Sequence, residues 1–250
     1  MSSQYNEPPT VNIVGYKFYR HSMDKLMEER ILPKLLNKEK NFIVTANPEI
    51  VMYAKNNKGF SSIIQNADVI VPDGIGVVLS SKLLKTPVEE RIAGYDLFLR
   101  LLKEANHYKK KVFFLGATQE NVSKVVSKVK NEYPNVDITG YRSGYNLPSD
   151  ESMVELINDL QPDIVFVALG YPKQEEWIHH NLPQFNQGLF VGLGGSFDVY
   201  SENLKRAPVL FQKLYLEWLF RLAQEPTRWK RMLSIPQFMA MVFKEKKKIK

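Results

Sequence analysis

Residues 110–118, KKVFFLGAT, decide the fold, because four apolar residues in succession run into a glycine and end at a threonine. Residues 119–132 follow directly and carry their apolar positions at helical spacing. An apolar run without alternation is typical of a strand that is covered on both faces. The stretch therefore predicts a buried parallel strand followed by a helix that packs on the sheet.

The same pattern recurs along the chain, so that strands alternate with helices. Apolar runs at 41–48 (NFIVTANP), 67–74 (ADVIVPDG) and 162–172 (PDIVFVALGYP) precede helices expected at 49–57, 75–84 and 173–181, and 188–195 (GLFVGLGG) adds another strand. Buried strands joined by helices build a doubly wound sheet. We expect an α/β, Rossmann-like parallel sheet with helices on both faces, preceded by a strand or hairpin at 11–18 and a helix over 23–37.

The composition is that of a folded protein without cysteine chemistry. The 250 residues are 44% hydrophobic and 24% charged, and the lack of cysteine excludes disulfides, thiolate metal sites and cysteine nucleophiles. The first ten residues lack the basic and apolar regions of a signal peptide, so we expect a cytoplasmic location. No run approaches the ~18–20 apolar residues that span a bilayer, so any membrane contact is expected to be peripheral.

The tail differs from the rest of the chain in both pattern and charge. Residues 201–250 hold 12 Lys and Arg against 4 Asp and Glu, whereas the first 200 residues hold 22 against 23. Residues 209–223 are apolar nearly all round, so we expect a helix there that buries more than one face, on the core, on a second subunit or at a lipid surface. We divide the chain into a catalytic domain (1–203) and a basic helical appendage (204–250).

Polar residues follow the predicted strands at the edge where open parallel sheets bind ligands. Asp73, in VPDG, suits a general base that accepts a proton from an attacking hydroxyl, although turn and helix-cap chemistry also explains an aspartate there. Asn47, in TANP, is able to bond a sugar hydroxyl or to cap the next helix. The residues alone leave both alternatives open.

A glycine loop and a polar turn lie at the same edge. The glycines of VGLGGSFD, at 192, 194 and 195, would let backbone amides approach a diphosphate, but the spacing departs from GxGxxG and argues against a dinucleotide oxidoreductase. In GYPKQEEW, Gln174 suits a contact to a sugar or phosphate oxygen, and Lys173 and Glu175 are expected on a solvated face.

No metal site is expected. The four histidines lack metal-ligand spacing, and no Asp-x-Asp triplet is present to hold a metal against a donor diphosphate. A transferase without a metal needs positive side chains to neutralise the leaving group, and Arg91 and the arginines of the tail are the candidates.

Taken in order, TANPEI, VPDGIGVV, RIAGYDLF, FFLGAT, VALGYPKQE, VGLGGSFDVYS and KRAP resemble the WecG/TagA/CpsF glycosyltransferase family over residues 11–231. Within the family, the chain looks most like the enzymes that start the wall teichoic acid linkage unit. The resemblance implies metal-independent, inverting transfer of N-acetylmannosamine from UDP-N-acetylmannosamine to N-acetylglucosaminyl-diphospho-undecaprenol, in a β-1,4 linkage and without a cofactor.

The resemblance also implies roles for individual residues. Asp73 matches the proposed catalytic base, and Arg91 matches an arginine on the phosphate side of the site. The family's appendage helps to close the pocket and docks on the inner face of the cell membrane. Ser201-Glu202-Asn203 departs from the Ser-Gly step expected after the aspartate. The remaining implied roles are polar pocket contacts for Thr45, Asn47 and Gln174, nucleotide contacts for Tyr145 and Asp198, and contacts to the lipid diphosphate or leaving UDP for Arg221, Arg228 and Arg231. The glycine loop described above adds Gly194 and Gly195 as expected substrate contacts.

Two other functions stay open. The same fold could transfer a different UDP-sugar to a lipid-linked acceptor for another surface polysaccharide, since nothing in the residues selects the donor sugar. A non-catalytic nucleotide-binding protein at the membrane surface would also keep the sheet and the basic tail. A nucleic-acid partner is not expected, because the lysines lie beside an unusually apolar segment. Self-association through that segment is an alternative to lipid docking.

Overall fold

The computed structural model describes residues 9–249 and has two sheets. A hairpin pairs β1 (Thr10–Ile13) with β2 (Tyr16–Tyr19). The main sheet has six parallel strands in the order β4-β3-β8-β7-β5-β6. Their bounds are Asn41–Ala46 (β3), Val69–Pro72 (β4), Lys111–Gly116 (β5), Asp137–Arg142 (β6), Ile164–Ala168 (β7) and Leu189–Gly192 (β8).

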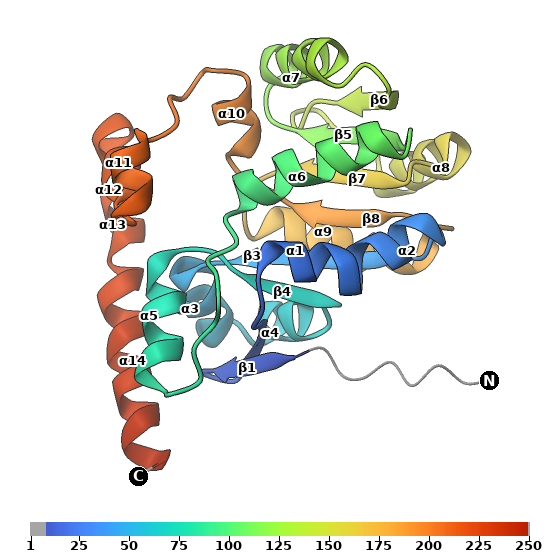
Figure 1. Cartoon of the computed structure of the whole chain (residues 1–250). Helices are drawn as coiled ribbons and strands as arrows, with labels where there is room; N and C mark the ends of the chain where they lie inside the picture. The colour runs from blue at the N-terminus through green and yellow to red at the C-terminus, as the bar shows by residue number, and fades with distance from the viewer. Residues whose placement is uncertain (1–8, 250) are drawn as a thin grey trace, which may run out of the picture.

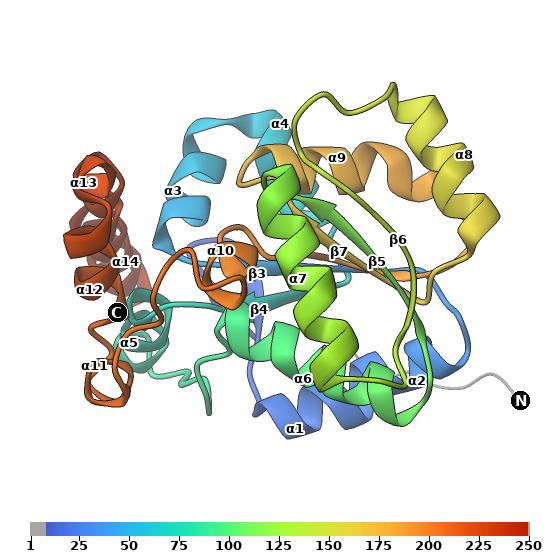
Figure 2. The ribbon, with the colours of Figure 1, turned by 90° about the horizontal axis from the view of Figure 1, so that it is seen from above.

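Helices cover both faces of the main sheet (Figures 1 and 2). Side chains of one strand alternate between two cores, so Phe42 and Val44 pack on one side and Ile43 on the other. The first core includes the hairpin with α3 (Pro48–Asn56), α4 (Lys58–Gln65), α5 (Ile75–Leu83), α8 (Asp150–Leu160) and α9 (Lys173–Asn181). The second includes α1 (Met23–Leu26), η1 (Met27–Ile31), α2 (Leu32–Leu36), α6 (Gly94–His107), α7 (Gln119–Glu132) and α10 (Ser196–Tyr200).

The doubly wound α/β prediction is confirmed, down to several helix bounds. The expected helices 119–132 and 173–181 have the bounds of α7 and α9, and the hairpin at 11–18 is present. Asn47 and Thr118 cap α3 and α7 by accepting from the backbone N–H of Ile50 and Asn121. The strand β6 was not predicted, because its residues DITGYR are only partly buried at the sheet edge and form no apolar run.

The last described residues, 204–249, form a C-terminal segment of short helices and one longer helix. Its helices are α11 (Val209–Lys213), α12 (Glu217–Gln224), η3 (Pro226–Arg228), α13 (Trp229–Met232) and α14 (Ser234–Ile249). The prediction of a single helix over 209–223 is wrong. The helix α11 ends at Lys213, and Tyr215 adopts a left-handed conformation with φ 58° before α12 begins. The helix α14 lies beside α3 and α5, where Phe238 and Val242 are fully buried (Figure 1).

Candidate active site

A cavity of about 250 Å³ lies between the carboxyl ends of β3, β4 and β8 and the C-terminal segment. The neighbouring strands β3 and β8 are followed by α3 and α10, which belong to opposite faces of the sheet. Where the helices that follow two neighbouring strands turn to opposite faces of the sheet, a crevice opens between them, and doubly wound proteins bind ligands there. The chain therefore forms its pocket at the sheet edge that the sequence predicted, with the C-terminal segment as the opposite wall.

Asp73 lies at the end of β4 and faces this cavity. Its backbone N–H donates to the carbonyl of Ala46 at 3.0 Å, and its Oδ2 accepts from the backbone N–H of Gly94 at 3.2 Å. Burial raises the pKa of Asp73, and the nearby positive charge of Arg91 only partly offsets that effect. A carboxylate with a raised pKa in a pocket is suited to accept a proton.

Arg91 lies between two carboxylates. Its Nη2 donates to Oε1 of Glu217 at 2.9 Å, and its side chain is only 12% exposed. Burial lowers the pKa of Arg91, but the charges of Asp73 and Glu217 outweigh burial and raise it overall, so the guanidinium stays protonated. The guanidinium carbon also lies 6.0 Å from the centre of the Tyr215 ring. Arg91 therefore joins the carboxyl edge of the sheet to the C-terminal segment.

Two of the three predicted arginines of the C-terminal segment line the cavity. Arg221 and Arg228 share Glu225, with distances of 3.1 Å and 3.2 Å to its Oε2. The guanidinium of Arg221 fills the space beside Gly195, where an added Cβ would lie 2.1 Å from Nη2. The third, Arg231, is outside the described lining: its Nε lies 3.4 Å from Oε1 of Glu49, on the first turn of α3.

The predicted polar contacts fall into two groups. Asn47 lines the cavity, with its Oδ1 accepting from Ile50 as a helix cap. Thr45 and Gln174 are buried beneath the cavity, where Thr45 Oγ1 donates to the carbonyl of Gly192 at 2.9 Å and Gln174 Oε1 accepts from the N–H of Gly194 at 2.9 Å. The structure therefore gives these two residues hydrogen bonds that hold the end of β8 and the loop after it.

Glu175 is not on a solvated face, contrary to the prediction. The side chain is fully buried, its Oε1 accepts from Gln174 Nε2 at 2.7 Å, and burial raises the pKa of Glu175 to about 7. The expectation for Lys173 is confirmed, since that residue is exposed. Successive residues of a helix point about 100° apart around its axis. The sequence alone therefore does not show that Glu175, and not Lys173, is the residue that faces the sheet.

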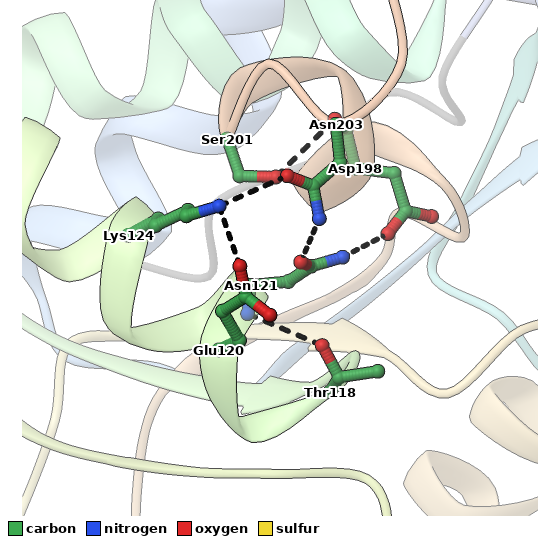
Figure 3. Close-up of polar contacts among 7 residues, drawn as sticks. All are labelled: Thr118, Glu120, Asn121, Lys124, Asp198, Ser201 and Asn203. Carbon is green, nitrogen blue, oxygen red and sulfur yellow. Dashed lines mark hydrogen bonds and ion pairs between the residues drawn. The ribbon is translucent and has the colours of Figure 1, made fainter.

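The two residues expected to contact a nucleotide lie outside the described lining of the cavity. Asp198, on α10, accepts from Asn121 Nδ2 at 2.6 Å in a polar cluster with α7, and Lys124 bonds Glu120 and Asn203 in the same cluster (Figure 3). Tyr145 is 69% exposed in the loop after β6. The cluster and the loop follow β8 and β6, at the same end of the sheet as the cavity.

The departure from the expected Ser-Gly step leaves a non-glycine residue in a left-handed backbone conformation. Glu202, which stands where a glycine was expected, has a φ of 64°, and this left-handed conformation favours glycine. Its carboxylate pairs with Lys128 at 2.5 Å. The chain thus keeps the backbone shape that the expected glycine would allow.

Several residues of the pocket were not predicted from the sequence. Glu217 and Tyr215 contact Arg91, Glu225 pairs with two arginines, and Arg206 pairs with Asp96 and lies 4.7 Å above the ring of Tyr95. No pattern in the sequence indicated these pairs beyond the count of acids and bases in the tail. Within residues 9–249, no cluster of three His, Asp or Glu side chains has the geometry to hold a metal ion.

A doubly wound sheet with a carboxylate and arginines facing one pocket is suited to an enzyme that acts on an anionic substrate. The chain belongs to the glycosyl transferase WecG/TagA/CpsF family, whose model matches residues 11–250, and is a glycosyltransferase. It is 48% identical over 206 residues to an N-acetylglucosaminyldiphosphoundecaprenol N-acetyl-beta-D-mannosaminyltransferase of Bacillus spizizenii, covering 82% of this chain and 80% of that protein. An equally named protein of Staphylococcus aureus is 41% identical over 242 residues, covering 96% and 94%.

Proposed function

We propose that this glycosyltransferase moves N-acetylmannosamine from UDP-N-acetylmannosamine to N-acetylglucosaminyl-diphospho-undecaprenol, in a β-1,4 linkage, during wall teichoic acid synthesis. The named activity of relatives at 41–48% identity supports the acceptor and the sugar. The observation that carries the proposal is the position of Asp73 beside Arg91 in a pocket that Arg221 and Arg228 also line.

The proposed reaction is a direct displacement. The 4-hydroxyl of the acceptor attacks the anomeric carbon, Asp73 takes the hydroxyl proton, and the bond from that carbon to the UDP oxygen breaks with inversion. Negative charge develops on the leaving diphosphate, where Arg91, Arg221 and Arg228 would stabilise it. Asn47, which lines the same pocket, is proposed to bond the reacting sugars, and Tyr145 and Asp198 to contact the nucleotide.

The arginines also support a reaction without a metal ion. Positive side chains that face a developing oxyanion in a partly dry pocket do the electrostatic work that a divalent cation does in other transferases. UDP release that persists in excess chelator and does not rise with added Mg²⁺ or Mn²⁺ is the expected result. Loss of release with chelator, restored by either cation, would contradict the proposal.

The C-terminal segment is proposed to be a membrane-association appendage, with the division of the chain placed at 203/204. Nine large apolar side chains of this segment are at least 36% exposed, and its basic residues outnumber its acidic ones. No helix of residues 9–249 has the length and hydropathy to cross a bilayer. Exposed apolar groups beside lysines suit a surface of anionic lipid. The nine are Val209, Leu210, Leu214, Tyr215, Trp218, Leu219, Trp229, Leu233 and Phe243.

Vesicle sedimentation tests this proposal. Binding to vesicles with phosphatidylglycerol is expected to exceed binding to pure phosphatidylcholine, and Leu210→Ser with Trp229→Ser is expected to weaken it about ten-fold, since each loses buried apolar area. Leu36→Ser, a similarly exposed leucine outside the segment, is the matched control. A concentration-dependent dimer that the double variant dissociates, without vesicle binding, would assign the surface to a second subunit instead.

The activity itself is tested by measuring UDP release from UDP-N-acetylmannosamine with the lipid-diphosphate acceptor. Release that depends on the acceptor establishes the donor, the acceptor and the reaction class together. Release from another UDP-sugar only would keep the glycosyltransferase and replace the proposed donor, which is the second candidate function.

A further inference from the structure

Glu175 and Gln174 form a buried pair below the loop that follows β8. Both lie in the first turn of α9, with side chains 0% and 2% exposed. Glu175 Oε1 accepts from Gln174 Nε2 at 2.7 Å, and Gln174 Oε1 accepts from the backbone N–H of Gly194 at 2.9 Å. The pair therefore connects the start of α9 to the loop between β8 and α10.

The carboxylate decides which way the Gln174 amide points. An amide side chain has a donor end and an acceptor end of nearly the same shape, and a half-turn exchanges them. Because Glu175 Oε1 accepts from the Gln174 amide, Glu175 holds the donor end toward itself and leaves the carbonyl end for Gly194. After a half-turn, the NH₂ group would face the N–H of Gly194, and two donors would meet.

The loop set by this pair carries one wall of the active site. Gly192 leaves room for Gln174, since an added Cβ would lie 2.7 Å from Nε2, and Gly195 packs against Arg221. The carbonyl of Gly192 accepts from Thr45, and Thr45 packs against Gly94, whose N–H donates to Asp73. A continuous set of contacts thus leads from Glu175 to both Arg221 and Asp73.

The buried carboxylate is costly for the fold. Glu175 Oε2 is one of the buried side-chain oxygens of residues 9–249 that lack a hydrogen-bond partner. An unpaired polar atom in the interior costs about 1–3 kcal/mol, and a charge costs more. Packing alone would be served better by an apolar side chain of the same size, so the cost points to a role in the site.

We propose that Glu175 is a positioning residue of the transfer reaction: it fixes the Gln174 amide and, through Gly194, the loop against which Arg221 packs. The inference rests on the proposed function, in which Arg221 meets the leaving diphosphate. Glu175 itself touches neither substrate nor reacting atoms; its effect reaches the reaction through the loop.

The test compares Glu175→Gln with Glu175→Met. The glutamine keeps an oxygen that accepts from Gln174, so kcat and KM for the UDP-sugar are expected within about three-fold of wild type. The methionine keeps the volume but removes the acceptor, so kcat/KM is expected to fall about 30-fold while the folded fraction is kept. Glu176→Met, at the neighbouring position, is the matched control and is expected to behave as wild type.

Amide hydrogen exchange of residues 192–196 gives a readout that does not need activity. Exchange is expected to be slow in wild type and in Glu175→Gln, and about ten-fold faster in Glu175→Met. Wild-type kinetics and slow exchange in Glu175→Met would overturn the inference, as would a glutamine variant as impaired as the methionine one. An inactive wild type with this exchange pattern would overturn the proposed function but keep the positioning role.

Discussion

Arg91 and Glu217 lie 126 residues apart in the chain and meet at 2.9 Å across the pocket. Arg91 belongs to the segment between α5 and α6 and Glu217 to α12, so the ion pair closes the pocket between the sheet and the C-terminal segment. The other arginines at the pocket are paired as well: Arg221 and Arg228 with Glu225, and Arg206 with Asp96. A diphosphate that enters the pocket must therefore replace carboxylates that are already in place.

The variant Glu217→Gln is expected to bind UDP about five-fold more tightly than wild type. The change removes the carboxylate that competes for Arg91, and a partly exposed ion pair contributes about 1 kcal/mol. Isothermal calorimetry at two salt concentrations measures the effect. Weaker UDP binding would show instead that Glu217 supports the bound state, and Glu202→Gln, an exposed carboxylate outside the described cavity lining, serves as the control.

The variant Asp73→Asn is expected to lose about three orders of magnitude in kcat, because general-base catalysis contributes ~10²–10⁴ to a rate. UDP affinity is expected to stay within about three-fold, since the amide keeps the volume of the carboxylate. Initial rates of UDP release and a calorimetric titration separate the two quantities. Turnover close to wild type would remove Asp73 from the role of base, and the exposed Asp159→Asn is the control.

The pH profile of kcat/KM is expected to fall on the acid side at a pH above the ordinary carboxyl range. Burial raises the pKa of Asp73, and a base is active only when ionised, so activity disappears as the pH falls through this raised pKa. Arg91→Ala is expected to move this limb to higher pH, because the arginine lowers the pKa of Asp73, and Glu217→Gln to move it to lower pH. Shifts in the opposite directions would contradict the assignment.

The variant Gly195→Ala is expected to lower kcat/KM about ten-fold while the melting temperature changes little. An added Cβ would lie 2.1 Å from Arg221 Nη2, and the end of a flexible side chain moves away more easily than backbone does. Circular dichroism and the UDP-release assay measure both effects. Gly59→Ala, on α4, is the control, because an added Cβ there would lie 3.4 Å from its nearest neighbour, Asn57 Oδ1. An equal loss of kcat/KM in both variants would contradict the packing argument.

The free energy of unfolding is expected to depend on pH through Glu175. Its folded pKa of about 7 lies above its ordinary value of 4.5, so protonation favours the folded state. This stabilisation, about 3 kcal/mol, is fully present below pH 4.5 and is lost as the pH rises through about 7. Between pH 5 and pH 8, the free energy of unfolding measured with urea is expected to fall less in Glu175→Gln than in wild type. Equal losses would place the titration elsewhere.

The sheet was predictable because its strands are buried on both faces and leave runs such as VFFL and IVFV in the sequence. The strand-end rule then selected Asn47 and Asp73, which do face the pocket. The rule locates an edge but gives no direction for a side chain. Thr45 and Gln174 lie at the same edge and point into the protein, and no local pattern distinguishes them from Asn47.

The opposite wall could not be derived from the sequence. The pairs Arg91–Glu217 and Arg231–Glu49 join residues far apart in the chain, and their partners are fixed by the packing of α14 on α3 and α5. The burial of Glu175 has a similar origin. A glutamate on the first turn of a helix is usually solvated, and only the tertiary contact with the loop after β8 brings it inside.

The pocket has the sheet edge as one wall and the C-terminal segment as the other. Because the sheet precedes this segment in the chain, it is also synthesised first. The sheet and Asp73 leave the ribosome before any residue of α12 or α14, so a growing chain holds the proposed base but neither Glu217 nor Arg221 and Arg228. Activated sugar that meets such a chain finds Arg91 alone among the arginines proposed to stabilise its leaving diphosphate. A chain that stops early is therefore expected to release UDP far more slowly than the complete chain, so that little donor is wasted by hydrolysis.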